Sequence, residues 1–132
     1  SVKLGGRRVD LRVAALPTVH GEEVVMRLLD TSDLQTDLAQ LGFGAEVLER
    51  YRKIFRRPHG AILVTGPTGS GKSTTLYGTL AELNAPERKI ITVEDPVEYR
   101  MRGINQVQVN PKVGLTFASG LRSILRADPD VV

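Results

Sequence analysis

One stretch of the sequence decides the fold, and it reads Gly66-Pro67-Thr68-Gly69-Ser70-Gly71-Lys72-Ser73. It fits without a mismatch the pattern of a glycine, four residues of any kind, and then Gly-Lys-Ser or Gly-Lys-Thr. Glycines let backbone amides turn inward around an anion, and a helix that begins near Lys72 presents its positive end to that anion. The stretch therefore predicts a loop that binds the phosphates of a nucleoside triphosphate.

The residue types in this loop suit the binding of ATP and Mg²⁺. We expect Lys72 to neutralise the β- and γ-phosphates and the Ser73 hydroxyl to bind Mg²⁺. Thr68 and Ser70 are candidates to hydrogen-bond phosphate, and Thr74 starts the helix. The candidate nucleotide-binding residues are Gly66, Pro67, Thr68, Gly69, Ser70, Gly71, Lys72, Ser73 and Thr74, and Lys72 is also a candidate catalytic residue.

The segments on either side of the loop predict an α/β fold. The continuous apolar run at 61–65 is typical of a strand that is covered on both faces of a parallel sheet. A helix is predicted over 72–84, before Pro86, and a second buried strand over 89–94. Strand, loop, helix and strand together form a βαβ unit.

Other segments of the second half also show clear periodicity. Residues 45–57 predict an amphipathic helix that Pro58 ends, and 104–109 alternate as a short exposed strand. Residues 116–126 predict a helix, and 128–132 resemble the start of another buried strand. The apolar stripe of the later helix is expected to be core, and it consists of Phe117, Leu121, Ile124 and Leu125.

The first thirty residues predict β structure. Apolar residues alternate with polar ones over 9–13 and again over 24–28, with arginines on the face opposite the apolar one. The connection at 16–22 carries Pro and Gly, so a hairpin with a long loop is expected. Residues 31–44 are expected to be a linker, in which Ser32 and Gln35 could form a capping box.

Composition limits the classes of protein that fit. The chain has 132 residues, a net charge of +3 and no cysteine, so it suits one modest core without disulfides or thiolate metal sites. The slight positive charge does not demand nucleic acid, and 5% aromatic residues leave little for base stacking. No apolar run approaches the length of a membrane span, and the first residues are not a signal peptide, so any membrane association is expected to be peripheral.

Successive blocks of the sequence resemble the type II secretion and type IV pilus assembly ATPase family, in family order and over nearly the whole chain. The blocks are Asp10–Val13, Leu16–Arg27, Arg57–Gly60, Gly66–Tyr77, Ile91–Glu98 and Leu125–Asp130. The resemblance implies a RecA-like P-loop NTPase domain with a three-layer fold, preceded by a PAS-like domain. Residues 1–30 would be the last strands of the PAS-like domain, 31–44 the linker, and 45–132 the first part of the RecA-like domain.

Three carboxylates lie at the end of the predicted strand at 89–94 or just after it, and carboxylates there could hold a metal ion or orient the attacking water. By resemblance to the family's acidic segment, Glu98 is the candidate base, and Glu94 and Asp95 are candidates for the metal site. The alternative is that these side chains cap turns beside Pro96 on a solvated edge.

Two arginines in the N-terminal strands are further catalytic candidates. Charge that develops on phosphate is often stabilised by an arginine from another domain or subunit. Arg12 and Arg27 match family positions whose arginines contact phosphates across the domain interface. The alternative is that they are exposed strand residues paired with neighbours such as Glu23 or Asp10.

The resemblance implies a homo-hexameric motor that is cytoplasmic and peripheral at the inner membrane. Its hydrolysis of ATP would drive extraction of pilin or pseudopilin, with an inner-membrane platform protein and other secretion or pilus components as partners and no nucleic acid. A pilus retraction ATPase or another RecA-like P-loop NTPase is the alternative. A GTPase is disfavoured because the sequence has no Asn-Lys-x-Asp segment, and a small kinase would leave the N-terminal strands unexplained.

The catalytic machinery of such a motor is expected to extend past Val132. A second acidic motif follows the next buried strand in the family, and a histidine box and, in many members, a tetracysteine zinc site come later. We therefore expect the 132-residue chain alone to hydrolyse ATP weakly or not at all.

Overall fold

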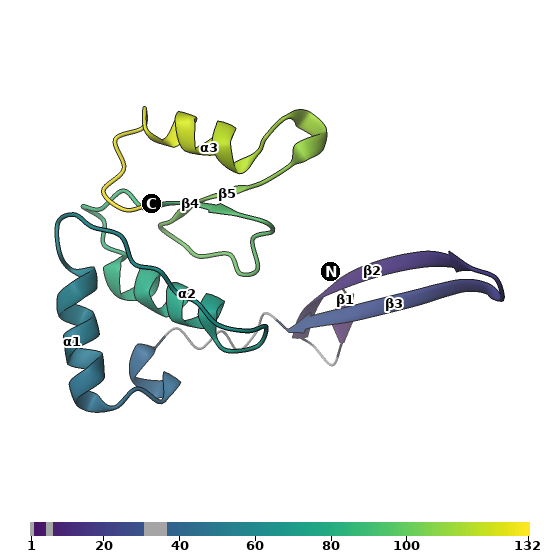
Figure 1. The fold of residues 1–132 in the computed structure, drawn as a ribbon, viewed down its shortest axis with the longest axis horizontal. Coiled ribbons are helices and arrows are strands. Elements are labelled where there is room, and N and C mark those ends of the chain that lie inside the picture. The colour runs from purple at the N-terminus through teal and green to yellow at the C-terminus, as the bar shows by residue number, and fades with distance from the viewer. Residues whose placement is uncertain (1, 5–6, 31–36) are drawn as a thin grey trace. The chain divides into compact units, whose positions relative to one another are not determined.

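The chain forms two compact units, Ser1–Leu34 and Gln35–Val132. The structure is a computed structural model that describes residues 2–4, 7–30 and 37–132 (Figure 1). The capping box expected at Ser32 and Gln35 lies outside the described residues, as does the first part of the expected linker. Each unit is described by itself below.

The first unit is an antiparallel sheet in the order β1 (Val2–Leu4), β2 (Arg7–Thr18) and β3 (Gly21–Asp30). The two expected strands are confirmed and are longer than predicted. The prediction of a long connecting loop is wrong, because Thr18 pairs with Gly21 and only two residues form the turn. The Thr18 hydroxyl donates to the Gly21 carbonyl at 2.8 Å, and Gly21 has a φ of +122°, so the local chemistry closes the turn tightly.

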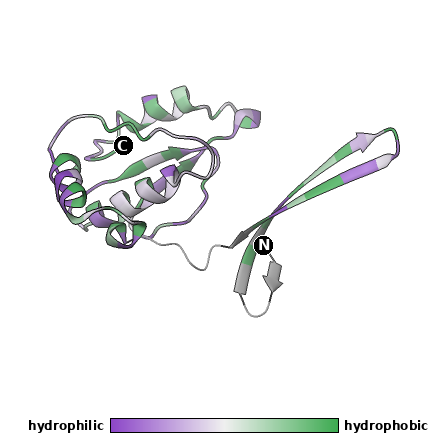
Figure 2. Ribbon diagram, turned by 60° about the horizontal axis from the view of Figure 1, so that its bottom comes forward, coloured by the Kyte–Doolittle hydropathy of each residue, from purple (hydrophilic) through white to green (hydrophobic). Residues whose placement is uncertain are grey.

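Side chains of β2 and β3 alternate between the two faces of this hairpin. Val13 lies opposite Met26, and the two side chains are 60% and 65% exposed, so the apolar face has little cover within its own unit. Figure 2 shows the hydrophobic colour along both strands. Arg12 lies opposite Arg27, which puts both on the other face.

The second unit has helices on both sides of a small parallel sheet. Strands β4 (Ile91–Glu94) and β5 (Asn105–Gln108) pair in parallel, and in Figure 1 α2 (Lys72–Leu83) and α3 (Phe117–Ile124) lie on opposite sides of them. The remaining elements are the 3₁₀ helices η1 (Leu38–Leu41) and η2 (Pro111–Val113) and the helix α1 (Ala45–Phe55). The unit is therefore layered α/β, as the sequence predicts.

The core of this unit lies where α1, α2 and η1 meet the start of β4. Leu38 and Ile90 are completely buried at its centre, and Leu48 and Phe55 of α1 pack with them. The ring of Tyr51 lies between Phe43, in a stacked arrangement, and Phe55, edge to face. Leu38 and Phe43, which the sequence analysis places in the linker, thus belong to the packed core or lie against it.

The strand expected at 61–65 does not form. Residues 61–65 have no assigned strand, and Leu63 is 87% exposed. One edge of β4 is paired with β5, and on the other side Ile90 bridges Val131 in parallel. Among the described residues, the apolar run at 61–65 pairs with neither of these segments. The bridge agrees with the expected strand start at 128–132.

The expectation that the whole stripe of α3 is core is also wrong. The helix begins with a capping box formed by Thr116 and Ser119 and contacts β4. A Cβ added at Gly120 would lie 3.5 Å from Val93, so the small residue allows this close approach. Ile124 is buried, but three other members of the stripe are half-exposed or more, namely Phe117, Leu121 and Leu125.

Candidate functional site

The loop before α2 has a backbone conformation that requires glycine. Gly66, Gly69 and Gly71 have φ values of +149°, +79° and +88°, which L side chains rarely adopt. A Cβ added at Gly66 would also lie 2.6 Å from the Ser70 hydroxyl oxygen. The Ser70 N–H donates to the Pro67 carbonyl at 3.3 Å and closes a turn within the loop. Thr68 lies exposed in that turn.

The side chain of Lys72 folds back over this loop. Its Nζ donates to the carbonyl oxygens of Gly66 at 2.9 Å and Pro67 at 2.7 Å. The ammonium group thus lies beside the loop backbone, where the sequence predicts phosphate.

The start of α2 offers backbone N–H groups to an anion. The helix begins at Lys72, and the first bond along its axis runs from the Thr75 N–H to the Gly71 carbonyl at 2.9 Å. Within the described part of the chain, no side chain caps this end of the helix. The N–H groups of the first turn and the helix dipole therefore suit phosphate, as do the glycine conformations and Lys72.

Two cavities flank the loop and α2. One has a volume of about 670 Å³ and takes in Lys72 and Thr74, with the aromatic ring of Phe43 in its wall. The other has a volume of about 870 Å³ and takes in Ser73 together with all three acidic candidates, Glu94, Asp95 and Glu98. The structure therefore brings the predicted magnesium-binding serine and the acidic segment to one cavity.

Glu94 is held by several side chains of the second unit. Its carboxylate accepts hydrogen bonds from the hydroxyl of Tyr77, from Thr92 at 2.5 Å and from Gln106 Nε2 at 3.0 Å. Both carboxylate oxygens accept hydrogen bonds, which hold the side chain in place beside Tyr77 and Gln106. Within residues 2–4, 7–30 and 37–132, no group of three or more His, Cys, Asp or Glu side chains is arranged to hold a metal ion.

Tyr77 is a residue of this site that the sequence analysis does not identify. Its ring is buried and packs edge to face against Tyr99, with centroids 5.4 Å apart. Its hydroxyl donates to Glu94 and accepts the backbone N–H groups of Glu98 at 3.2 Å and Tyr99 at 3.4 Å. Burial, followed by the hydrogen bond to Glu94, raises the pKa of Tyr77 to about 12, so the hydroxyl keeps its proton at neutral pH. Tyr77 lies five residues after Lys72, and nothing in the sequence around it indicates a role in the site.

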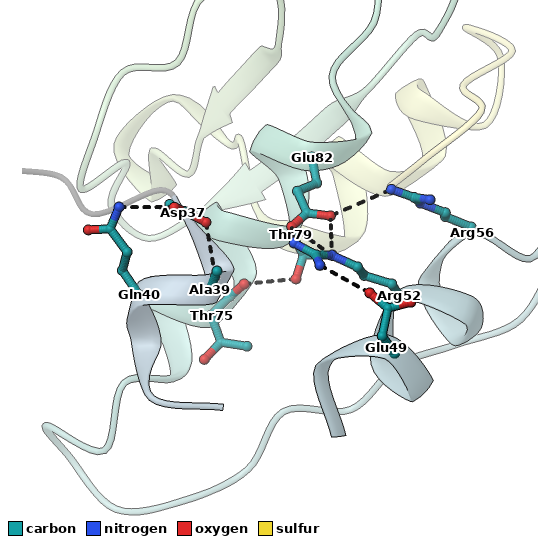
Figure 3. Close-up of polar contacts among 9 residues, drawn as sticks. All are labelled: Asp37, Ala39, Gln40, Glu49, Arg52, Arg56, Thr75, Thr79 and Glu82. Carbon is teal, nitrogen blue, oxygen red and sulfur yellow. Dashed lines mark hydrogen bonds and ion pairs between the residues drawn. The ribbon is translucent and has the colours of Figure 1, made fainter. Parts of the chain in front are cut away.

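Contacts between α1 and α2 hold the helix that starts at the loop (Figure 3). Arg52 binds Glu82 through both Nε and NH2, with the shortest contact at 2.7 Å, and Arg56 lies 3.7 Å from the same carboxylate. The hydrogen bond to Glu82 is the main cause of a raised pKa for Arg52. Tyr51 and Thr79 add a hydroxyl pair at 2.8 Å. These contacts pack α2 against α1.

Arg12 and Arg27 belong to the first unit and lie opposite each other on β2 and β3. Arg12 is half-buried and Arg27 is exposed. Their role at the phosphates remains a prediction, because the two units are described separately.

A family model described as "Type II/IV secretion system protein" matches residues 1–132, the whole chain. The chain is 61% identical over 132 residues to "Type II secretion system ATPase E" of Vibrio cholerae serotype O1, of which it covers 26%. It is 55% identical over 128 residues to "Type IV pilus assembly ATPase PilB" of Myxococcus xanthus, of which it covers 23%. The chain thus spans about a quarter of the length of these relatives.

Two solved structures, of a pilus retraction motor and of another ATPase, have a similar fold. The "Pilus Retraction Motor PilT and Bound ADP" matches with a TM-score of 0.73 and 35% identity, over 92% of this chain and 35% of that chain. The ATPase DotB of Legionella pneumophila matches with a TM-score of 0.70 over 98% of this chain and 37% of that one, and at 24% identity it speaks for the fold alone.

Proposed function

The chain belongs to the type II/IV secretion system protein family, and on that premise we propose that it is the nucleotide-binding part of an ATP-driven motor. The motor would power type II protein secretion or type IV pilus assembly, as the names of the similar ATPases suggest. The observation that carries the proposal is the loop before α2, in which the glycine conformations, the helix start and Lys72 all suit phosphate. The second unit would be the first part of a RecA-like domain, and the first unit the last strands of a PAS-like domain.

Within this site each candidate residue has a distinct task. The loop amides and Lys72 would bind the β- and γ-phosphates, and Ser73 would bind Mg²⁺. Bound Mg²⁺ would neutralise charge on the transferred phosphoryl group. Glu98 would orient the attacking water and accept its proton, while Glu94 and Asp95 would act near the metal through its waters, which fits the engaged oxygens of Glu94.

Arg12 and Arg27 would complete the site by stabilising the charge on phosphate from the first unit of the same or another subunit. Their opposition in the sheet supports this role, because two guanidinium groups on one face can bind one anion together. The motor would act as a homo-hexamer with nucleotide between the two domains.

The proposed setting is the cytoplasmic face of the inner membrane. In the part of the chain that the structure describes, none of the helices has the length and apolarity that a bilayer crossing requires. We propose that contact with the membrane is peripheral and made through partners, among them a platform protein, with pilin or pseudopilin as the substrate that is moved.

A pilus retraction motor is the second candidate, and the likeness to the PilT structure is the observation in its favour. The names of the relatives at 55–61% identity favour secretion and assembly. Deletion of the gene, followed by assays for secreted proteins, for surface pili and for pilus retraction, would distinguish the alternatives.

We also propose that the 132-residue chain alone hydrolyses ATP weakly. The described residues contain no group of three or more His, Cys, Asp or Glu side chains arranged to hold a metal ion, so Mg²⁺ would be bound mainly by Ser73, the phosphates and water. Steady hydrolysis by the purified chain that Lys72→Ala abolishes would contradict this proposal.

A further inference from the structure

Tyr77 lies on the same side of α2 as the predicted magnesium-binding residue. Ser73 and Tyr77 are four residues apart, a spacing that puts two side chains on one face of a helix. Both line the cavity of about 870 Å³ that also contains Glu94 and Glu98. The tyrosine therefore bridges the helix of the phosphate loop and the acidic segment.

The hydroxyl of Tyr77 uses all of its hydrogen-bonding capacity on the acidic segment. A phenol has one donor and two acceptor sites. The donor goes to the carboxylate of Glu94, and the acceptors receive the backbone N–H groups of Glu98 at 3.2 Å and Tyr99 at 3.4 Å.

Gln106 makes the segment rigid from the opposite side. Its Nε2 donates to Glu94 at 3.0 Å and to the Tyr99 carbonyl at 2.8 Å, and its Oε1 accepts the Met101 N–H at 2.7 Å. Gln106 of β5 thus holds the segment at Glu94, Tyr99 and Met101, and Tyr77 is the contact to the Glu98 N–H. Loss of the Tyr77 hydroxyl would release the middle, where Glu98 lies.

We propose that Tyr77 is a positioning residue for ATP hydrolysis, whose hydroxyl sets the main chain of Glu98 relative to Ser73 and the phosphate loop. The inference rests on the proposed function, because it assigns a role within that same site. Tyr77 would act through Glu98 and would not itself touch the nucleotide. A small displacement of a catalytic group is enough to slow a reaction strongly.

The test is Tyr77→Phe in the full-length gene product, which keeps the buried ring and removes the hydroxyl. We expect kcat for ATP hydrolysis to fall about tenfold to 100-fold while KM for ATP stays within about twofold. Glu82→Gln is the matched control, because Glu82 also lies on α2 but binds Arg52 and Arg56, away from the acidic segment. With a comparable loss of thermal stability, the control should keep the wild-type kcat.

A double-mutant cycle separates positioning from a general structural effect. In a Glu98→Gln background, Tyr77→Phe should lower kcat no further, because the group on which it acts is already gone. The inference is overturned if Tyr77→Phe leaves kcat within about twofold of wild type, or lowers it by the same factor in both backgrounds. Lys72→Ala, measured in the same assay, distinguishes failure of this inference from failure of the proposed function. If Lys72→Ala hydrolyses ATP at the wild-type rate, both are contradicted. If Lys72→Ala loses hydrolysis while Tyr77→Phe stays fully active, only this inference is contradicted.

Discussion

Arg12 of β2 lies directly opposite Arg27 of β3, so two positive side chains share one face of the hairpin. Like charges in such a pair destabilise a sheet by up to about 1 kcal/mol. Two guanidinium groups on one face can bind one anion together, which is the role proposed for this pair.

We therefore predict that Arg12→Ala and Arg27→Ala each lower ATP hydrolysis without lowering stability. In the full-length gene product, turnover should fall on the order of 1,000-fold, the range seen when an arginine at transferring phosphate is lost. The free energy of unfolding should change by about 1 kcal/mol or less. Arg50→Ala, on the exposed side of α1, is the control and should leave both quantities unchanged. Full turnover by both hairpin variants would remove these arginines from the site.

Gly66 and Gly69 allow a test of the loop conformation. Alanine at either position would adopt a positive φ at a cost of about 1–3 kcal/mol, but only at Gly66 would the new Cβ meet another side chain, the Ser70 hydroxyl at 2.6 Å. We expect Gly66→Ala to lower the melting temperature more than Gly69→Ala does. Addition of Ser70→Ala to Gly66→Ala should recover part of the loss. Equal effects of the two glycine substitutions would mean that the loop conformation differs from the one described.

The contacts of Arg52 predict which carboxylate holds α1 against α2. Glu82 is 19% exposed and binds Arg52 through two nitrogens, whereas Glu49 is 64% exposed and makes one contact at 3.3 Å. Glu82→Gln should lower the melting temperature clearly, and Glu49→Gln should change it little, because exposed pairs are screened by water. Thermal unfolding followed by circular dichroism would measure both, and the reverse order would contradict the geometry.

Tyr77 predicts a dependence of stability on alkaline pH. Its pKa rises from about 10 in the unfolded chain to about 12 in the folded one, so the folded state holds the proton more tightly. The stabilisation is present below about pH 10 and is lost as the pH rises through about 12. Urea unfolding of wild type and Tyr77→Phe should therefore show a smaller difference in unfolding free energy at pH 11 than at about pH 8. A difference that stays constant would show that Tyr77 titrates normally.

Local chemistry explains which parts of the fold could be predicted from the sequence. The loop at 66–73, α1, α2 and β4 depend on glycine spacing, on helical or strand periodicity and on proline, all of which act over a few residues. The tight turn after Thr18 was not predicted. Pro17 suggested a longer loop, whereas the hydrogen bond from the Thr18 hydroxyl to the Gly21 carbonyl closes a turn of two residues.

Packing between distant segments explains what could not be predicted. The apolar run at 61–65 is a good strand sequence, but a strand forms only where its backbone pairs with another strand. In the described residues β4 pairs with β5 and Ile90 bridges Val131, whereas 61–65 pair with neither. In the same way, the periodicity of α3 identifies an apolar stripe but not how much of the stripe is buried. Phe117 and Leu121 remain exposed in the structure. Tyr77 was missed because its role comes from three contacts with residues about 20 positions further along the chain.

The most direct test of the central claim is a calorimetric titration of the full-length gene product, as wild type and as Lys72→Ala, with Mg²⁺ and a non-hydrolysable ATP analogue. The account predicts saturable binding to the wild type and loss of that binding in Lys72→Ala, since Lys72 lies over the loop carbonyls where the phosphates would bind. Lys53→Ala, an exposed lysine on α1, should bind as the wild type does. Equal affinity of wild type and Lys72→Ala for the analogue would contradict the account.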